Sequence, residues 1–135
     1  MAAKNSVKEF VPDGIYHIYN RGVEKRIIFL DVQDRTVFLS YLKTYLLPKD
    51  ENALHATLAN PASSSKEKNQ ALKQLRLNNF TDTLSLLADC LMPNHFNLLV
   101  KQTDADTIHR FMNSFGVRYS AYFNRKYRRI GCLFQ

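Results

Sequence analysis

The sequence of 135 residues has little glycine, proline or cysteine and no long apolar run, and each scarcity excludes a class of protein. Four glycines and four prolines are too few for a collagen-like or low-complexity chain. No apolar stretch approaches the roughly 20 residues that a membrane-spanning helix needs, and residues 1–6 contain no apolar signal-peptide core. With 45% apolar and 23% charged residues, the composition predicts a single cytoplasmic domain over residues 1–135, without a membrane partner.

The two cysteines, Cys90 and Cys132, are far apart in the sequence and form no Cys-x-x-Cys pair. This usage fits a reducing compartment and excludes a cysteine-based zinc site within the chain. Cys90 lies inside an apolar run, so we expect it to be a small buried side chain.

Acidic residues are scarce toward the C-terminal end. Nineteen Lys and Arg against twelve Asp and Glu give a net charge of +7, and no acidic residue follows Asp106. The basic residues that follow it are Arg110, Arg118, Arg125, Lys126, Arg128 and Arg129. This excess favours an anionic partner, most commonly nucleic acid. A solvated basic tail that only aids solubility is the alternative.

Residue patterns in the first third of the chain predict a strand and then a helix. Residues 14–22 are rich in β-branched and aromatic side chains and are bounded by glycines, which indicates a strand. Apolar pairs recur at four-residue spacing after Asp34. This spacing predicts a helix that is capped near Asp31 or Asp34 and ends before Pro48.

The second half predicts a hairpin followed by a helix. Residues 84–92 and 95–101 are expected to be strands joined by the turn at 93–94. A helix is expected to begin at Asp106 or Thr107. Its apolar positions are Ile108, Phe111, Met112, Phe115, Tyr119, Tyr122 and Phe123.

Residues 48–79 differ from their surroundings, because 60–66 has turn and linker chemistry and few apolar residues follow. We predict a flexible insertion here that contains a short helix over 65–77. Without it, the order strand, helix, strand, strand, helix is typical of an α+β, ferredoxin-like antiparallel sheet with helices packed on one face. A last strand of that pattern is missing.

The most informative stretch follows the hairpin turn. Side chains at i and i+2 of a strand share a face, so His95 and Asn97 are expected to point away from the core and Phe96, Leu98 and Val100 into it. Two neighbouring nitrogen or oxygen donors are suitably placed to hold a divalent cation. A strand-end histidine hydrogen-bonded to the backbone is the alternative, which spacing alone favours.

Three segments carry a resemblance to a known family: residues 16–22, residues 90–100, and the run 119–125 continued by 131–135. In this order they resemble the single-tyrosine HUH transposases of the IS200-like, REP-associated group, over nearly the whole chain except the insertion at 48–79. The resemblance implies the HUH transposase fold, a homodimer, and nicking and rejoining of single-stranded or hairpin DNA. In that chemistry, two histidines around a hydrophobic residue hold Mg²⁺ or Mn²⁺, and a tyrosine attacks the phosphorus to form a phosphotyrosine.

The resemblance assigns metal ligation to His95 and, in place of the second histidine, to Asn97. An Asn carbonyl oxygen can ligate a hard cation such as Mg²⁺, whereas Mn²⁺ binding is expected to weaken without the second imidazole. His17 is a further candidate ligand, because its strand is expected to neighbour that of His95. A structural role for His17 is the alternative.

The family's nucleophilic tyrosine lies on a helix beyond the segment that matches 133–135, so no residue of this chain corresponds to it. The last strand and that helix are accordingly expected to be missing. Tyr127 is the candidate substitute, since it lies among basic residues and we expect it to be exposed. Tyr119 and Tyr122 fall on the apolar stripe and are expected to be core residues.

Basic residues near aromatic ones are the expected DNA contacts, since cations grip phosphates and aromatic rings stack on unpaired bases. They are Arg21, Arg118, Arg125, Lys126, Arg128 and Arg129. Two other interpretations stay open. One is a non-catalytic module that binds single-stranded nucleic acid, and the other is a fragment of a longer gene without function.

Overall fold

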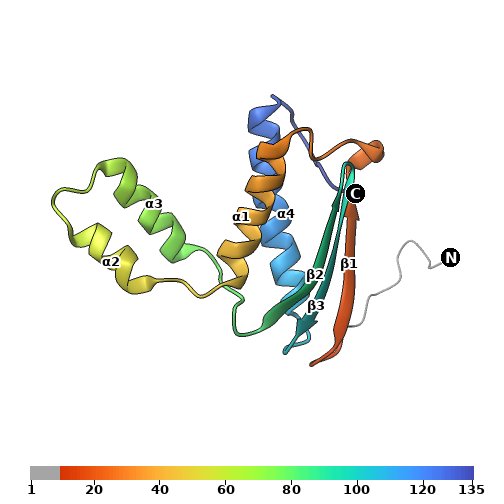
Figure 1. Ribbon diagram of the computed structural model, residues 1–135, viewed down its shortest axis with the longest axis horizontal. Coiled ribbons are helices and arrows are strands. Elements are labelled where there is room, and N and C mark those ends of the chain that lie inside the picture. Colours follow the sequence, from red (N-terminus) through yellow and green to blue (C-terminus); the bar gives the residue numbers. More distant parts are fainter. Residues whose placement is uncertain (1–9) are drawn as a thin grey trace.

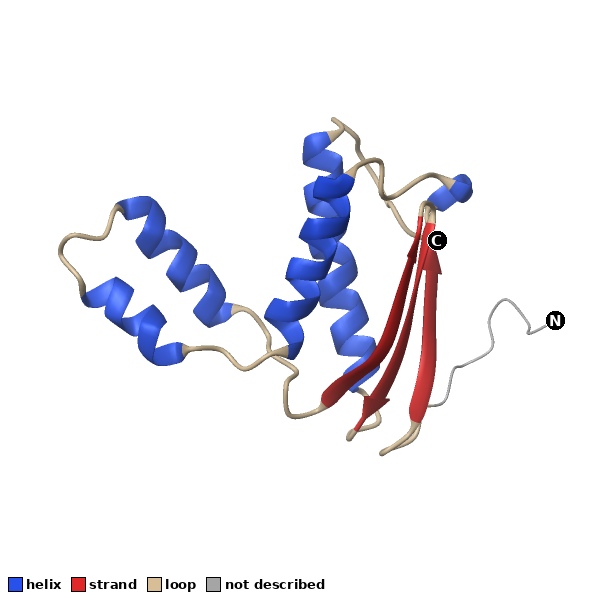
Figure 2. Cartoon of the chain, viewed as in Figure 1, coloured by secondary structure: helices blue, strands red, loops and turns tan. Residues whose placement is uncertain are grey.

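The chain forms an antiparallel sheet with two long helices on one of its faces and a helical arm at one side (Figures 1 and 2). The structure is a computed structural model that describes residues 10–135. The predicted α+β class with an antiparallel sheet is confirmed. No helix within residues 10–135 is long and apolar enough to cross a membrane.

Three strands make up the sheet of the described residues: β1 (Ile15–Arg21), β2 (Leu84–Met92) and β3 (His95–Gln102). Their order is β1-β3-β2, and β3 pairs antiparallel with both neighbours. All three strands and the hairpin agree with the sequence prediction, as does the pairing of the first strand with that of His95. β3 is therefore the central strand, and its two faces have different neighbours.

Helices α1 (Val32–Leu46) and α4 (Thr107–Lys126) lie on the same face of the sheet (Figure 2). The side chain of Asp31 caps α1 by accepting a hydrogen bond from the amide of Asp34 at 2.9 Å. Of the two caps that the sequence predicted, Asp31 is therefore the one that the structure confirms. The predicted start of α4 is also confirmed. The apolar periodicity explains this arrangement, because each helix has one stripe to bury.

The core lies between these helices and the sheet, and Phe38 of α1 is at its centre. The Phe38 ring is fully buried, with its centroid 4.8 Å from that of Phe115 and 5.1 Å from that of Phe96. From α4, the predicted positions Ile108, Phe111, Phe115, Tyr119 and Phe123 are buried. Each such side chain contributes about 1.5–3 kcal/mol by leaving water, so the core fixes both helices on the sheet.

The segment predicted as an insertion folds into a hairpin of two helices, α2 (Glu51–Ala59) and α3 (Ser65–Arg76), which forms the arm in Figure 1. The predicted helix over 65–77 is confirmed. Helix α2 was not predicted, because it has few apolar residues at helical spacing and buries none of its residues fully. The flexibility of this segment stays a prediction.

The C-terminal segment runs beside the end of β1 and begins to pair with it. Gly22 and Phe134 form an isolated antiparallel bridge, and the amide of Gln135 donates to the carbonyl of Arg21 at 2.9 Å. Leu133 is fully buried. These contacts hold residues 133–135 against the sheet edge next to Arg21.

Cys90 is exposed, so the prediction that it is buried is wrong. Its strand β2 lies at the edge of the sheet, and helices cover only one face of that sheet. Cys90 pairs with Asn97 of β3 and shares its uncovered face. An apolar run suggested a strand buried on both sides, whereas only one side is covered here.

Candidate nucleic-acid interface on the open sheet face

The face of the sheet opposite α1 and α4, called here the open face, carries polar residues from all three strands. Alternation along each strand, together with the pairing register, defines its membership. Its residues on β1 and β3 are Ile15, His17, Tyr19, Arg21, His95, Asn97, Leu99 and Lys101. Its residues on β2 are Ser85, Ala88, Cys90 and Met92.

The two faces of β3 are divided as the sequence predicts. Phe96, Leu98 and Val100 are at most 1% exposed and point into the core. His95 and Asn97 are half-buried on the opposite face. The regular alternation of β3 therefore brings these two candidate ligands side by side on a rigid strand.

His17 and Asn97 lie in contact on the open face. The imidazole Nε2 of His17 donates a hydrogen bond to the Asn97 Oδ1 atom at 2.8 Å. The predicted neighbourhood of His17 and the candidate ligands is thus present. In this arrangement, however, Nε2 of His17 carries a proton and cannot also ligate a cation through that atom.

Tyr19 is a residue of this face that sequence reasoning missed. Its side chain is 50% exposed, and its ring centroid lies 5.2 Å from that of His95. Nδ1 of His95 donates to the side-chain oxygen of Asn94 at 2.8 Å, so Nε2 is the ring nitrogen that remains for a ligand. The same two-residue alternation that paired His95 with Asn97, applied to β1, would have found Tyr19 between His17 and Arg21.

Arg21 ends β1 and pairs in register with His95. Its Nε donates to Oε1 of Gln135 at 3.1 Å. Within residues 10–135 the two terminal guanidinium nitrogens make no hydrogen bond, so they can donate to an anion. The Gln135 contact holds the arginine at the same end of the open face as His95.

The open face offers few donors to a metal ion. No group of three His, Cys, Asp or Glu side chains suited to a metal ion occurs in the described part of the chain. The available donors are Nε2 of His95 and Oδ1 of Asn97, which already accepts a hydrogen bond from His17. Neither is a carboxylate, whereas protein sites for Mg²⁺ usually contain one or two carboxylates.

Tyr127, the candidate nucleophile, is only partly exposed, and its hydroxyl donates to Oδ2 of the buried Asp34 at 2.5 Å. Burial and this hydrogen bond raise the pKa of Tyr127 above its ordinary value, which disfavours the phenolate that would attack. Lys126, a candidate DNA contact, forms ion pairs with Asp34 at 2.9 Å and with Asp31 at 2.7 Å. The side chains of Tyr127 and Lys126 therefore both bind the Asp34 carboxylate.

The other predicted DNA contacts belong to the helix layer and not to the open face. Arg118 lies over the ring of Tyr41, with 4.1 Å from the guanidinium carbon to the centroid. Arg129 donates to the side chain of Asn124 and to the carbonyl of Cys132. Arg125 and Arg128 are exposed near the end of α4, which lies at the same end of the molecule as the end of β1 (Figure 1).

Comparisons of the chain with family models, with curated proteins and with solved structures returned no match. The family resemblance is therefore carried by the three quoted segments, and what the protein does has to be argued from the open face itself.

Proposed function

We propose that this protein binds single-stranded DNA on the open face, as a transposase-type DNA-binding protein. The observation that carries the proposal is the adjacency of Tyr19 and Arg21 on β1 with His95 and Asn97 on β3. An exposed aromatic ring, a cation and polar side chains on a sheet face that no helix covers are the means by which sheets bind unpaired nucleotides.

Each of these side chains has a distinct role in the proposal. The Tyr19 ring stacks on a base, and Arg21 donates to a phosphate. The amide of Asn97 and the imidazole of His95 offer hydrogen bonds to the edges of splayed-out bases. Duplex DNA lacks exposed base faces, so the open face is expected to prefer single strands.

The test is fluorescence anisotropy with a labelled hairpin-tipped single strand. Because stacking on one aromatic ring contributes about 1–3 kcal/mol per base, we expect Tyr19→Ala to weaken binding about 5- to 150-fold. Tyr19→Phe is the matched control, since it keeps the ring and is expected to bind like the wild type. Equal binding by Tyr19→Ala, or equal affinity for duplex DNA, would overturn the proposal.

Cys90 provides a second readout, because it lies on the open face beside Asn97 and is exposed. In a Cys132→Ser variant, maleimide modifies Cys90 alone. Bound single-stranded DNA is expected to slow this modification, whereas added duplex DNA is expected to leave its rate unchanged. An unchanged rate at saturating single strand would mean that the DNA binds elsewhere.

Nicking and rejoining of DNA with Mg²⁺ or Mn²⁺ is a second candidate function, favoured by the shared face of His95 and Asn97. A covalent protein–DNA adduct on a denaturing gel that forms with either cation and not with EDTA would support it. Tyr19→Phe and Tyr127→Phe would then identify the tyrosine. DNA binding that EDTA leaves unchanged, with no adduct, would support the binding module alone. Sedimentation of the same protein tests the proposed homodimer.

A further inference from the structure

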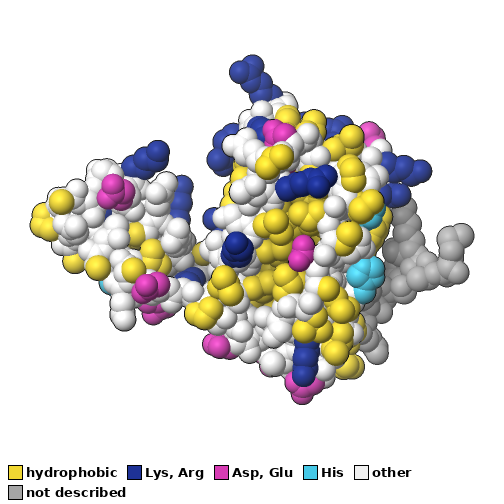
Figure 3. All heavy atoms as spheres, in the orientation of Figure 1, with side chains coloured by type: hydrophobic (Ala, Val, Ile, Leu, Met, Phe, Trp, Pro, Cys, Tyr) yellow, Lys and Arg dark blue, Asp and Glu magenta, His cyan; other side chains and the backbone are white. Residues whose placement is uncertain are grey.

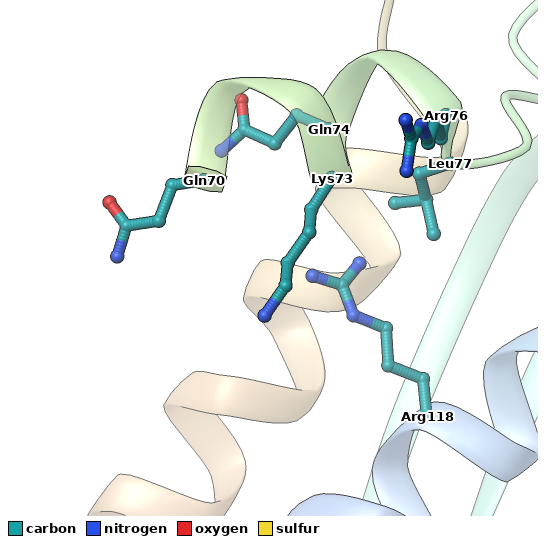
Figure 4. A pocket seen from close by; sticks show the side chains of 6 residues that line it. All are labelled: Gln70, Lys73, Gln74, Arg76, Leu77 and Arg118. Carbon is teal, nitrogen blue, oxygen red and sulfur yellow. The ribbon is translucent and has the colours of Figure 1, made fainter. Parts of the chain in front are cut away.

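A basic cavity lies between the helical arm and the body of the protein, away from the open face. It has a volume of about 630 Å³ and is called here the basic notch. Six residues line it: Gln70, Lys73, Gln74, Arg76, Leu77 and Arg118. Figure 4 shows the Lys73 side chain extending from α3 toward the guanidinium of Arg118 on α4.

The charge of the basic notch is unbalanced. Three of its six lining residues are cations and none is acidic. Within residues 10–135, Lys73, Arg76 and Arg118 form no salt bridge. Figure 3 shows Lys and Arg side chains on the side of the arm that faces the body. Like charges held close together repel one another, so an anion between them would be favourable.

Arg118 has a hydrogen-bonding group that the described residues do not satisfy. Its guanidinium lies against the rings of Tyr41 and Tyr45, at 4.1 and 5.8 Å from their centroids. Its Nη1 atom is buried and has no hydrogen-bond partner within the described part of the chain. An unsatisfied buried donor is costly, and guanidinium groups bind phosphate oxygens well.

Contacts at the base of the arm hold the basic notch in shape. Nζ of Lys49 donates to the carbonyls of Leu75 and Leu77, where α3 ends. The side-chain amide of Asn79 donates to the carbonyls of Thr44 and Leu47 at the end of α1. The end of α3, which carries Lys73 and Arg76, is therefore held beside α1 before any ligand arrives, which lowers the entropy cost of binding.

We propose that the basic notch is a second binding site for the phosphate backbone of single-stranded DNA. The volume exceeds that of one phosphate group, and Gln70 and Gln74 add amide donors between the cations. This inference rests on the proposed function, because the strand that enters the notch is the one that the open face binds. The arm thus adds a contact that the three-stranded sheet does not supply.

The experiment measures binding of a labelled thymidine oligonucleotide, long enough to span both sites, across a range of sodium chloride concentrations. Each lost phosphate contact lowers the log–log salt slope by about 0.7, so Lys73→Ala/Arg76→Ala is expected to lower it by about 1.4 and to weaken binding about tenfold. Lys66→Ala/Lys68→Ala is the matched control, because it removes the same charge from α3 outside the notch. The control is expected to keep the wild-type slope.

Four outcomes would overturn the inference. If both double variants weakened DNA binding equally, the effect would come from the overall positive charge and not from the notch. If the notch variant bound DNA like the wild type while Tyr19→Ala bound more weakly, the open face would be the DNA-binding site and the notch would not. If inorganic phosphate at matched ionic strength weakened DNA binding by the wild type and by the notch variant equally, phosphate groups would not compete for the notch. If the wild type did not bind DNA, both proposals would be overturned. If the notch variant bound DNA more weakly while Tyr19→Ala bound like the wild type, the open-face proposal alone would be overturned.

Discussion

The carboxylate of Asp34 joins the start of α1 to the end of α4, and Asp34→Asn tests how much this junction stabilises the fold. Asp34 is fully buried. Its Oδ1 accepts from the Tyr122 hydroxyl at 2.8 Å, and its Oδ2 accepts from the amide of Leu30 at 2.9 Å and from the Tyr127 hydroxyl at 2.5 Å. Lys126 also donates to Oδ1, at 2.9 Å.

The amide nitrogen of an asparagine cannot accept, so the variant loses at least the hydrogen bonds to one oxygen. Hydrogen bonds to a charged acceptor contribute about 1.5–3 kcal/mol each, so two lost bonds predict a destabilisation of about 3–6 kcal/mol. That is a large part of the roughly 5–15 kcal/mol by which a domain is stable. Asp31→Asn is the matched control, because asparagine also caps helices and the ion pair it breaks is half exposed.

The assay is urea unfolding followed by circular dichroism at several pH values. Burial alone would raise the pKa of Asp34, but the hydrogen bonds from Tyr127, Lys126, Leu30 and Tyr122 outweigh it and lower the pKa below its ordinary value. A carboxyl with a lowered pKa stabilises the fold fully above the unfolded-chain pKa of about 3.9 and loses that contribution as the pH falls through the folded pKa. The difference between wild type and Asp34→Asn is therefore expected to be full at neutral pH and to shrink in acid. A variant as stable as Asp31→Asn at neutral pH would refute this reasoning.

Four further predictions concern packing and exposure. Phe38→Ala is expected to cost about 3–5 kcal/mol in urea unfolding, because it leaves a cavity at the centre of the core. Gly116→Ala is expected to raise stability by about 0.5–1 kcal/mol, since the added methyl meets nothing within 4 Å inside a helix. Gly22→Ala is expected to lower the melting temperature, because its methyl would lie 2.2 Å from the carbonyl oxygen of Arg26. Cys90 is expected to react with a thiol reagent in the native protein as fast as an exposed cysteine does, and a rate that rises only on unfolding would contradict its placement.

Local patterns were sufficient for most elements of the fold. The two-residue alternation of β3 and the four-residue periodicity of α1 and α4 are properties of neighbouring residues, and the structure confirms all three. Helix α2 was not predicted because few of its residues are apolar at helical spacing. Its formation therefore depends on the cap at Asp50 and on packing against α3.

The candidate site was predictable in part. Alternation along β3 placed His95 and Asn97 on one face, and the structure confirms that they share it. The contact of His17 with Asn97 and the ring of Tyr19 beside His95 depend on the register of β1 against β3. No local pattern specifies that register, because the two strands are separated by the whole of the arm and α1.

By itself, the sequence determined the strands, most helices, the buried face of each element and the excess of positive charge, because these follow from spacing and composition over a few residues. The tertiary structure alone decided which cations are available. Lys126 is neutralised by Asp31 and Asp34, more than 90 positions away in the chain, whereas Lys73 and Arg118 both line the basic notch, which no acidic residue lines. The physical reason is that Coulomb and hydrogen-bond energies depend on distances of a few ångströms, which only the folded chain establishes.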